Sequence, residues 1–317
     1  MLQMKCSVFL WCAALLFYSS RICSAGEYEA GKKALDNKDY LTAVKLFRAG
    51  IAKGDKQSPN SLGELYVLGL GVRKDKSVAC QLFLKGAKRG DAAAQHNYGI
   101  CMAKGKTGKQ DYRKAYTWFS SAMKQGHKPA FCELGNLYIS GSGTKKDAKR
   151  GFKLCLKGAK AGNTKAAARV GELYFSGVGT KKDMQLAHRW LKKAGDKQHP
   201  SASYNLGLMY LKGEGVAKSQ DKARRWFTVS ALQRHVIAYV PAAALHRNKV
   251  MNLLDQEKID ERSTRWAIFF LTLAHSIQTG TKQKAAYANL IDLFSELSPR
   301  ARRLADQDLS KWNTNNM

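Results

Sequence analysis

The sequence predicts an all-α protein built from stacked helix–turn–helix repeats with a 36-residue period. Glycine recurs five times at this interval, and tyrosine, a second glycine and alanine recur in the same frame. A fixed period over this length is the signature of a repeat array, in which each unit packs on its neighbours. The series are Gly63, Gly99, Gly135, Gly171 and Gly207; Tyr66, Tyr138, Tyr174 and Tyr210, with Met102 in the gap; Gly69, Gly105, Gly141, Gly177 and Gly213; and Ala43, Ala79, Ala115, Ala187 and Ala223.

Residues 1–25 are expected to be a secretory signal peptide. Lys5 precedes an apolar run over residues 6–18, and Cys23-Ser24-Ala25 has the small residues of a cleavage site. The alternative is an uncleaved membrane anchor, but the run is shorter than the roughly 18–20 residues that a span needs. We therefore expect an exported protein, periplasmic or secreted (or in the secretory-pathway lumen of a eukaryote), and not an integral membrane protein after cleavage.

The chain is strongly basic, with 54 Lys and Arg against 24 Asp and Glu and a formal net charge of +30. Such a surplus attracts anionic partners, among them cell-wall glycan and lipopolysaccharide. The alternative is that the charges are ordinary solvated helix faces. A specific nucleic-acid partner is disfavoured, because basic and aromatic residues are not interleaved.

Before the regular array, residues 26–56 are predicted to form a tetratricopeptide-like hairpin of two short helices, broken at residues 37–39. Gly31 precedes Ala43 by 12 residues, whereas Gly63 precedes Ala79 by 16. The regular repeats therefore carry a loop four residues longer.

Residues 61–91 illustrate the regular repeat. Leu62, Leu65, Tyr66 and Leu68 fall at helical spacing and predict the buried stripe of a first helix. Gly63 is expected where the partner helix approaches closely. Gly69 and Gly71 then end the helix, and Asp75 is placed to cap the second helix, whose inner face holds Ala79, Leu82, Phe83 and Ala87.

The repeated motif L-G-x-x-Y-x-x-G-x-G-[VT]-x-x-D, followed by A-x-x-W-[FL]-x-x-[AS], resembles the Sel-one-like repeat (SLR), a relative of the tetratricopeptide repeat. Five copies span residues 57–236, and the second of these departs from the motif at Met102, Thr107 and Gly108. The resemblance implies αα-hairpins stacked in a right-handed superhelical solenoid. It also implies a protein–protein or protein–glycan scaffold that works outside the cytoplasm, in a bacterial envelope or toward a host.

Beyond Phe227 the register fades. Residues 237–297 are predicted to be degenerate repeats, with Pro241 as an interruption and helices at residues 265–280 and 285–294. Residues 298–317 are predicted to be a capping helix and a loose tail, because Ser298 and Pro299 suit the N-cap and the first helical position.

Four cysteines follow the expected signal peptide, and two pairings are favoured. Cys132 and Cys155 lie about equally far from the loop at Gly143, and Cys80 and Cys101 stand similarly about the turn at Gly90. Disulfides suit an exported protein. The alternative is four buried thiols.

The sequence contains no catalytic constellation, no metal-ligand spacing and no cofactor motif, so we expect a binding protein rather than an enzyme. The segments GSGTKKD and GVGTKKD resemble phosphate-binding loops, but they recur as inter-helix loops of the repeat.

In tetratricopeptide-like arrays the first helices line the concave face, which we expect to bind another protein. The most apolar part of this face is predicted at Phe175, Tyr204, Leu208 and Leu211, and ordinary variation at exposed positions remains the alternative. The candidate partner-binding residues are Asn60, Glu64, His96, Ile100, Asn136, Ile139, Glu172, Phe175, Tyr204, Leu208 and Leu211.

Overall fold

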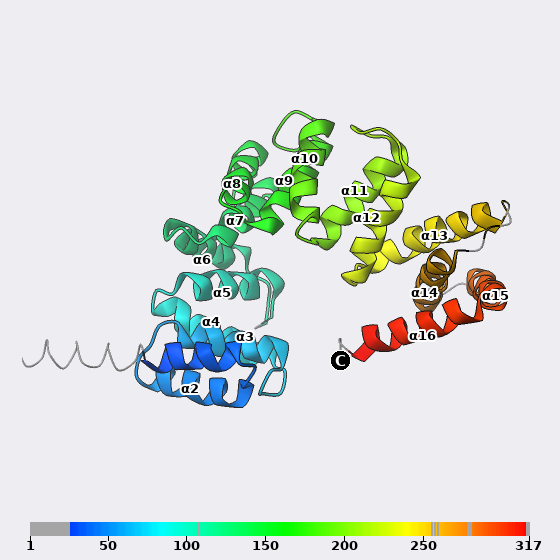
Figure 1. Cartoon of the computed structure of the whole chain (residues 1–317). Coiled ribbons are helices and arrows are strands. Elements are labelled where there is room, and N and C mark those ends of the chain that lie inside the picture. Colours follow the sequence, from blue (N-terminus) through cyan, green and yellow to red (C-terminus); the bar gives the residue numbers. More distant parts are fainter. Residues whose placement is uncertain are drawn as a thin grey trace, which may run out of the picture. The chain divides into compact units, whose positions relative to one another are not determined.

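The structure is a computed structural model that describes residues 26–106, 108–254, 256, 258, 260–277 and 281–314. Over these residues the regular secondary structure is helical, with no strand, and within each of the two units described below consecutive helices pack against one another (Figure 1). The predicted all-α fold of stacked helix hairpins is confirmed. The expected signal peptide and the end of the expected tail, residues 315–317, lie outside the described residues.

The chain divides into two compact units, one ending at Asn163 and one beginning at Thr164. In the N-terminal unit, residues 26–36 form a helix. It is followed by α2 (Tyr40–Ala52), α3 (Ser58–Leu68), α4 (Lys76–Lys88), α5 (Ala92–Lys104), α6 (Tyr112–Lys124), α7 (Lys128–Ser140) and α8 (Ala148–Lys160). The first hairpin is joined by residues 37–39 and the second by residues 69–75, so the predicted four-residue difference in loop length is confirmed.

The C-terminal unit continues the same pairing and ends in longer helices. Its elements are α9 (Thr164–Ser176), α10 (Met184–Gly195), α11 (Pro200–Lys212), α12 (Gln220–Leu232), the 3₁₀ helix η1 (Val236–Ala238), α13 (Tyr239–Leu254), α14 (Glu261–Ile277), α15 (Thr281–Leu297) and α16 (Pro299–Thr314). The predicted boundaries at residues 56, 236 and 297 stay predictions.

The motif glycines are contact points between the two helices of a hairpin. A Cβ added to Gly63 would lie 2.6 Å from the Phe83 ring, and one added to Gly99 would lie 2.6 Å from Phe119. Gly207 stands in the same relation to Phe227, at 2.7 Å. Any side chain here would force the helices apart, which explains a helix-interior glycine despite its low helix propensity.

The hairpin loops follow the predicted chemistry. Gly69 has φ +78° and Gly71 has φ +67°, a left-handed conformation that glycine adopts without strain. Asp75 caps α4 by accepting hydrogen bonds from the backbone N–H groups of Ser77 and Val78. The irregular loop of the second regular repeat has only a local effect, because Asp111 still caps α6 through the N–H of Lys114.

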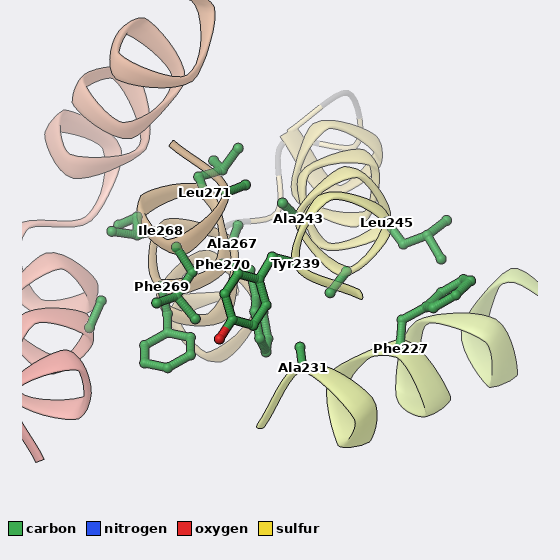
Figure 2. Close-up of a cluster of buried hydrophobic side chains, with 14 of the residues drawn as sticks. Phe227, Ala231, Tyr239, Ala243, Leu245, Ala267, Ile268, Phe269, Phe270 and Leu271 are labelled. Atoms are coloured by element: carbon green, nitrogen blue, oxygen red, sulfur yellow. The ribbon is translucent and has the colours of Figure 1, made fainter. Parts of the chain in front are cut away.

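A large buried cluster holds α12, α13, α14, α15 and α16 together. Figure 2 shows Phe227 from α12, Ala243 from α13 and Phe269 and Phe270 from α14 within it. The expectation that Pro241 interrupts this region is wrong. It lies in the first turn of α13, where a backbone N–H would have no partner within the helix.

Helix α16 closes the C-terminal unit in the predicted way. The Ser298 hydroxyl accepts a hydrogen bond from the N–H of Ala301 at 3.2 Å, and Pro299 is the first helical residue. Arg265 Nε and Nη2 each donate a hydrogen bond of 2.6 Å to the carboxylate of Asp308, and this pair joins α14 to α16. This hydrogen bonding raises the pKa of the Arg265 guanidinium. In the part of the chain that the structure describes, no helix has the length and apolar character needed to cross a bilayer.

Candidate partner-binding cleft

A cleft of about 490 Å³ opens between α3, α4 and α5 in the N-terminal unit. Its apolar lining comes from Val67 and Leu68 on α3, Phe83 on α4 and Ile100 on α5. Lys76, Lys104 and Lys106 bring positive charge to the same cleft, and Glu64 is its one carboxylate. The cleft is therefore apolar with a cationic surplus.

Equivalent positions of successive repeats build this cleft. Glu64 follows the contact glycine Gly63, and Ile100 follows Gly99 in the next repeat. Because each glycine faces the second helix of its own hairpin, the residue after it is turned away from that contact and toward the cleft.

The Glu64 carboxylate is held in place by two amides. Asn60 Nδ2 donates to Glu64 Oε1 at 3.0 Å, and Asn97 Nδ2 donates to the same oxygen at 3.3 Å. Asn97 also donates to Asn60 Oδ1 at 2.9 Å. Asn60 is itself buried, so its amide orients Glu64.

A disulfide between Cys80 and Cys101 forms part of the cleft wall and joins α4 to α5. Both residues are buried, and their Cα atoms are 6.0 Å apart. A second disulfide, Cys132–Cys155, joins α7 to α8 with a Cα separation of 4.0 Å. The structure thus brings together both pairs that the sequence favoured.

The cleft contains residues that the sequence interpretation placed elsewhere. Leu68 was expected in the buried stripe, but it is 62% exposed, so that assignment is wrong. The signal was in the repeat itself. The positions equivalent to Leu68 are polar in every other repeat, namely Lys104, Ser140, Ser176 and Lys212. No such signal marked Lys76, Lys104 and Lys106, because many other lysines are spread along the chain.

The other candidates of the N-terminal unit do not line this cleft. His96 is half-buried, and its ring lies 5.8 Å from Phe119 and 5.0 Å from His127 between centroids. Asn136 and Ile139 are half-buried on α7. The Ile139 side chain covers Gly151 of α8, where an added Cβ would approach it to 2.6 Å.

In the C-terminal unit, several predicted contact residues have structural partners. Tyr204 packs edge-on against Phe227 and His235, each with a centroid distance of 5.4 Å. Leu208 and Leu211 pack against the buried cluster. These three side chains therefore take part in the packing of the C-terminal unit.

Glu172 and Phe175 lie on α9. Glu172 pairs with Arg169 at 3.0 Å, and Phe175 is half-buried. Over the described residues, no group of three or more His, Cys, Asp or Glu side chains is arranged to hold a metal ion.

The comparisons with known proteins agree with this architecture. The model of the Sel1 repeat matches residues 60–91, 92–127, 130–163, 164–199 and 200–235, more than half of the chain. No sequence match was found among curated proteins.

Two solved structures resemble the chain. A Sel1 repeat protein from Oxalobacter formigenes is 29% identical, with 78% of this chain and 96% of that chain covered and a TM-score of 0.62. A protective antigen of uropathogenic Escherichia coli with an SLR fold is 20% identical, with 84% of this chain and 68% of that chain covered and a TM-score of 0.53. Its likeness concerns the fold alone. The five matched repeats and the helix-pair architecture together show that the chain belongs to the Sel1 repeat family.

Proposed function

We propose that the chain is an exported scaffold that binds a protein partner, in a bacterial envelope or outside the cell, and that the cleft between α3, α4 and α5 is its principal contact. Sel1 repeats are in general protein–protein interaction modules. The single observation that carries this proposal is the exposed apolar side chain of Leu68 beside a lysine-rich cleft. Exposed apolar groups next to a defined concavity are typical of interaction sites.

The charge of the cleft indicates the chemistry of the partner. Three lysines face one glutamate, and among the described residues no ion pair involves Lys76, Lys104 or Lys106. A segment with an apolar anchor flanked by acidic side chains would bury Leu68 and pair with these lysines. Export is supported by the signal-like residues 1–25 and by the two disulfides, which persist in oxidising compartments.

The experiment is a crosslinking capture from the native compartment with the wild type, Leu68→Glu and Leu41→Glu. Leu41 lies on α2 in the same unit and is 74% exposed, so its variant is a matched control. We expect Leu68→Glu to lower partner recovery about tenfold or more, since it replaces an apolar anchor with a carboxylate. Equal recovery with both variants would place the contact elsewhere.

A second candidate function is the binding of an anionic envelope polymer, such as cell-wall glycan or lipopolysaccharide, through the basic surface. The net charge of +30 favours it. Exposed charge pairs are screened by salt, so retention on such a polymer should fall steeply as the salt concentration rises. Capture through the cleft should fall less steeply, because salt screens the pairing with its lysines but not the apolar contact of Leu68, and the same capture repeated at low and high salt separates the two.

A further inference from the structure

The C-terminal unit contains a second pocket of different chemistry, separate from the cleft in the N-terminal unit. It has a volume of about 590 Å³ and lies between α12, α13 and α14. Arg224 and Arg225 come from α12, Lys249 from α13, and Arg262 from the start of α14. Four cationic side chains from three helices therefore converge on one pocket.

Two acids offset half of that charge, namely Asp260 in the lining and Asp221, which lies outside the lining and pairs with Arg224. Arg224 binds Asp221 at 2.9 Å, and this hydrogen bond is the main reason that the pKa of Asp221 is lowered, with Lys249 and Arg225 adding to the effect. Asp260 accepts hydrogen bonds from the Ser263 hydroxyl and from the N–H of Arg262 at 3.1 Å. Four cations against two carboxylates leave a surplus of two positive charges.

A buried histidine in the lining of the same pocket has a pKa that the nearby positive charges help to lower. His246 is 2% exposed, and its Nε2 lies 2.9 Å from the Thr228 hydroxyl oxygen. Burial, with the charges of Arg224 and Lys249 adding to its effect, lowers the pKa of His246 to about 3. Its Nδ1 is buried and has no hydrogen-bond partner within the described chain. His246 therefore lines the pocket as a neutral side chain and adds no charge of its own at neutral pH.

An aromatic wall stands next to these charges. Trp266 lines the pocket and stacks on Phe270 at a centroid distance of 5.6 Å, with an interplanar angle of 19°. Phe270 belongs to the buried cluster drawn in Figure 2, which fixes this wall. A ring attached to an anionic group could pack on Trp266 while the anion meets the cations.

We propose that this pocket binds a phosphate monoester, with its dianionic phosphoryl group among Arg224, Lys249 and Arg262 and its ring against Trp266. A phosphate monoester carries close to two negative charges at neutral pH, which matches the surplus of the pocket. Guanidinium groups bind phosphate oxygens in a bidentate manner, and Lys249 supplies a further point charge. A carboxylate would balance only one of the two charges.

The test is calorimetric titration of the full mature chain with inorganic phosphate, phenyl phosphate and benzoate at constant ionic strength. We expect a single saturable site for phosphate, tighter binding of phenyl phosphate, and binding of benzoate at least about tenfold weaker than that of phenyl phosphate. Benzoate that binds as tightly as phenyl phosphate, or the absence of saturable phosphate binding, would overturn the proposal.

A matched pair of double variants separates this site from general charge attraction. Lys249→Gln with Arg262→Gln should weaken phenyl phosphate binding about tenfold or more, because two of the four cations are lost. Lys181→Gln with Lys182→Gln removes the same charge from an exposed loop of the same unit and should leave the affinity unchanged. Equal weakening in both would mean that no defined site exists. The circular dichroism melt of each variant shows that the fold is retained.

Discussion

At the scale of single residues, His246 shows how burial controls a charge. Its pKa is lowered to about 3, chiefly by desolvation and then by Arg224 and Lys249. Between pH values of about 3 and 6.5 the imidazole therefore stays neutral in the folded chain, whereas an exposed histidine would be protonated. Above its ordinary pKa of 6.5, neither the folded nor the unfolded state is protonated, and His246 has no effect on pH dependence. Below that value only the unfolded chain takes up the proton, so the free energy of unfolding falls.

A prediction follows for the variant His246→Gln, whose amide can still bond Thr228. The free energy of unfolding of the wild type should fall relative to that of the variant by about 1.4 kcal/mol per pH unit below pH 6.5, or about 2 kcal/mol by pH 5. Denaturant titration at several pH values measures this difference. Histidines that both proteins share cancel in the comparison, and a difference that does not change with pH would contradict the assignment.

The residue scale also shows where sequence interpretation fails. The period identified Gly63 and Asp75 correctly, because backbone contact and helix capping each require particular residue types. It misplaced Leu68, because helical spacing alone cannot distinguish the edge of a buried stripe from its centre. His246, Lys249 and Arg262 could not be grouped with Arg224 in advance, since these three residues lie beyond the end of the regular register.

At the scale of elements, the hairpin is defined by the contact of its two helices. The α3–α4 contact depends on the absence of a side chain at Gly63, where a Cβ would lie 2.6 Å from the Phe83 ring. Gly63→Ala should lower the free energy of unfolding by about 1–3 kcal/mol from overpacking, although alanine has the better helix propensity by about 1 kcal/mol.

Phe83→Ala provides the control for that prediction. In its background, Gly63→Ala should cost much less or become stabilising, because the ring that it would strike is gone. Denaturant unfolding of the four members of this double-mutant cycle measures the coupling. Additive effects of the two substitutions would show that Gly63 is not a contact residue.

The elements were predictable to different degrees. Helices α3 to α12 follow from the repeat, because the recurring glycines and the residue that caps each second helix fix the same boundaries; this cap is aspartate in four copies and Ser219 in the fifth. Helix α16 was evident from its own cap at Ser298 and Pro299. The extent of α13 was not, because the motif is lost there and Pro241 suggested a break that its place in the first turn avoids.

At the scale of the whole molecule, the pairing of the cysteines leads to predictions about both the compartment and the stability of the protein. The chain has seven cysteines, and the four beyond residue 25 form the two disulfides of the structure. Their sequence separations of 21 and 23 residues imply about 3 kcal/mol of stabilisation each, by restriction of the unfolded chain.

The corresponding measurement is the intact mass of the protein isolated from its native compartment. We expect a chain that begins at Gly26 and whose four cysteines react with an alkylating reagent only after reduction and unfolding. Reduction should also lower the unfolding midpoint, since both cross-links constrain the unfolded state. A retained N-terminus would contradict export by signal cleavage, and four alkylated thiols without reductant would contradict the disulfides.

The two disulfides differ in what they join, and this has a mechanical consequence. Cys80–Cys101 links the second helix of one repeat to the first helix of the next, whereas Cys132–Cys155 links the two helices of a single hairpin. Repeat arrays under tension give way by peeling at their interfaces, since each repeat contacts only its neighbours. The Cys80–Cys101 disulfide would keep two adjacent repeats attached when their interface separates. The Cys132–Cys155 disulfide would prevent the unfolded hairpin from extending to its full length. A scaffold of this kind can be stretched at its ends while the cleft beside Cys80–Cys101 keeps its wall.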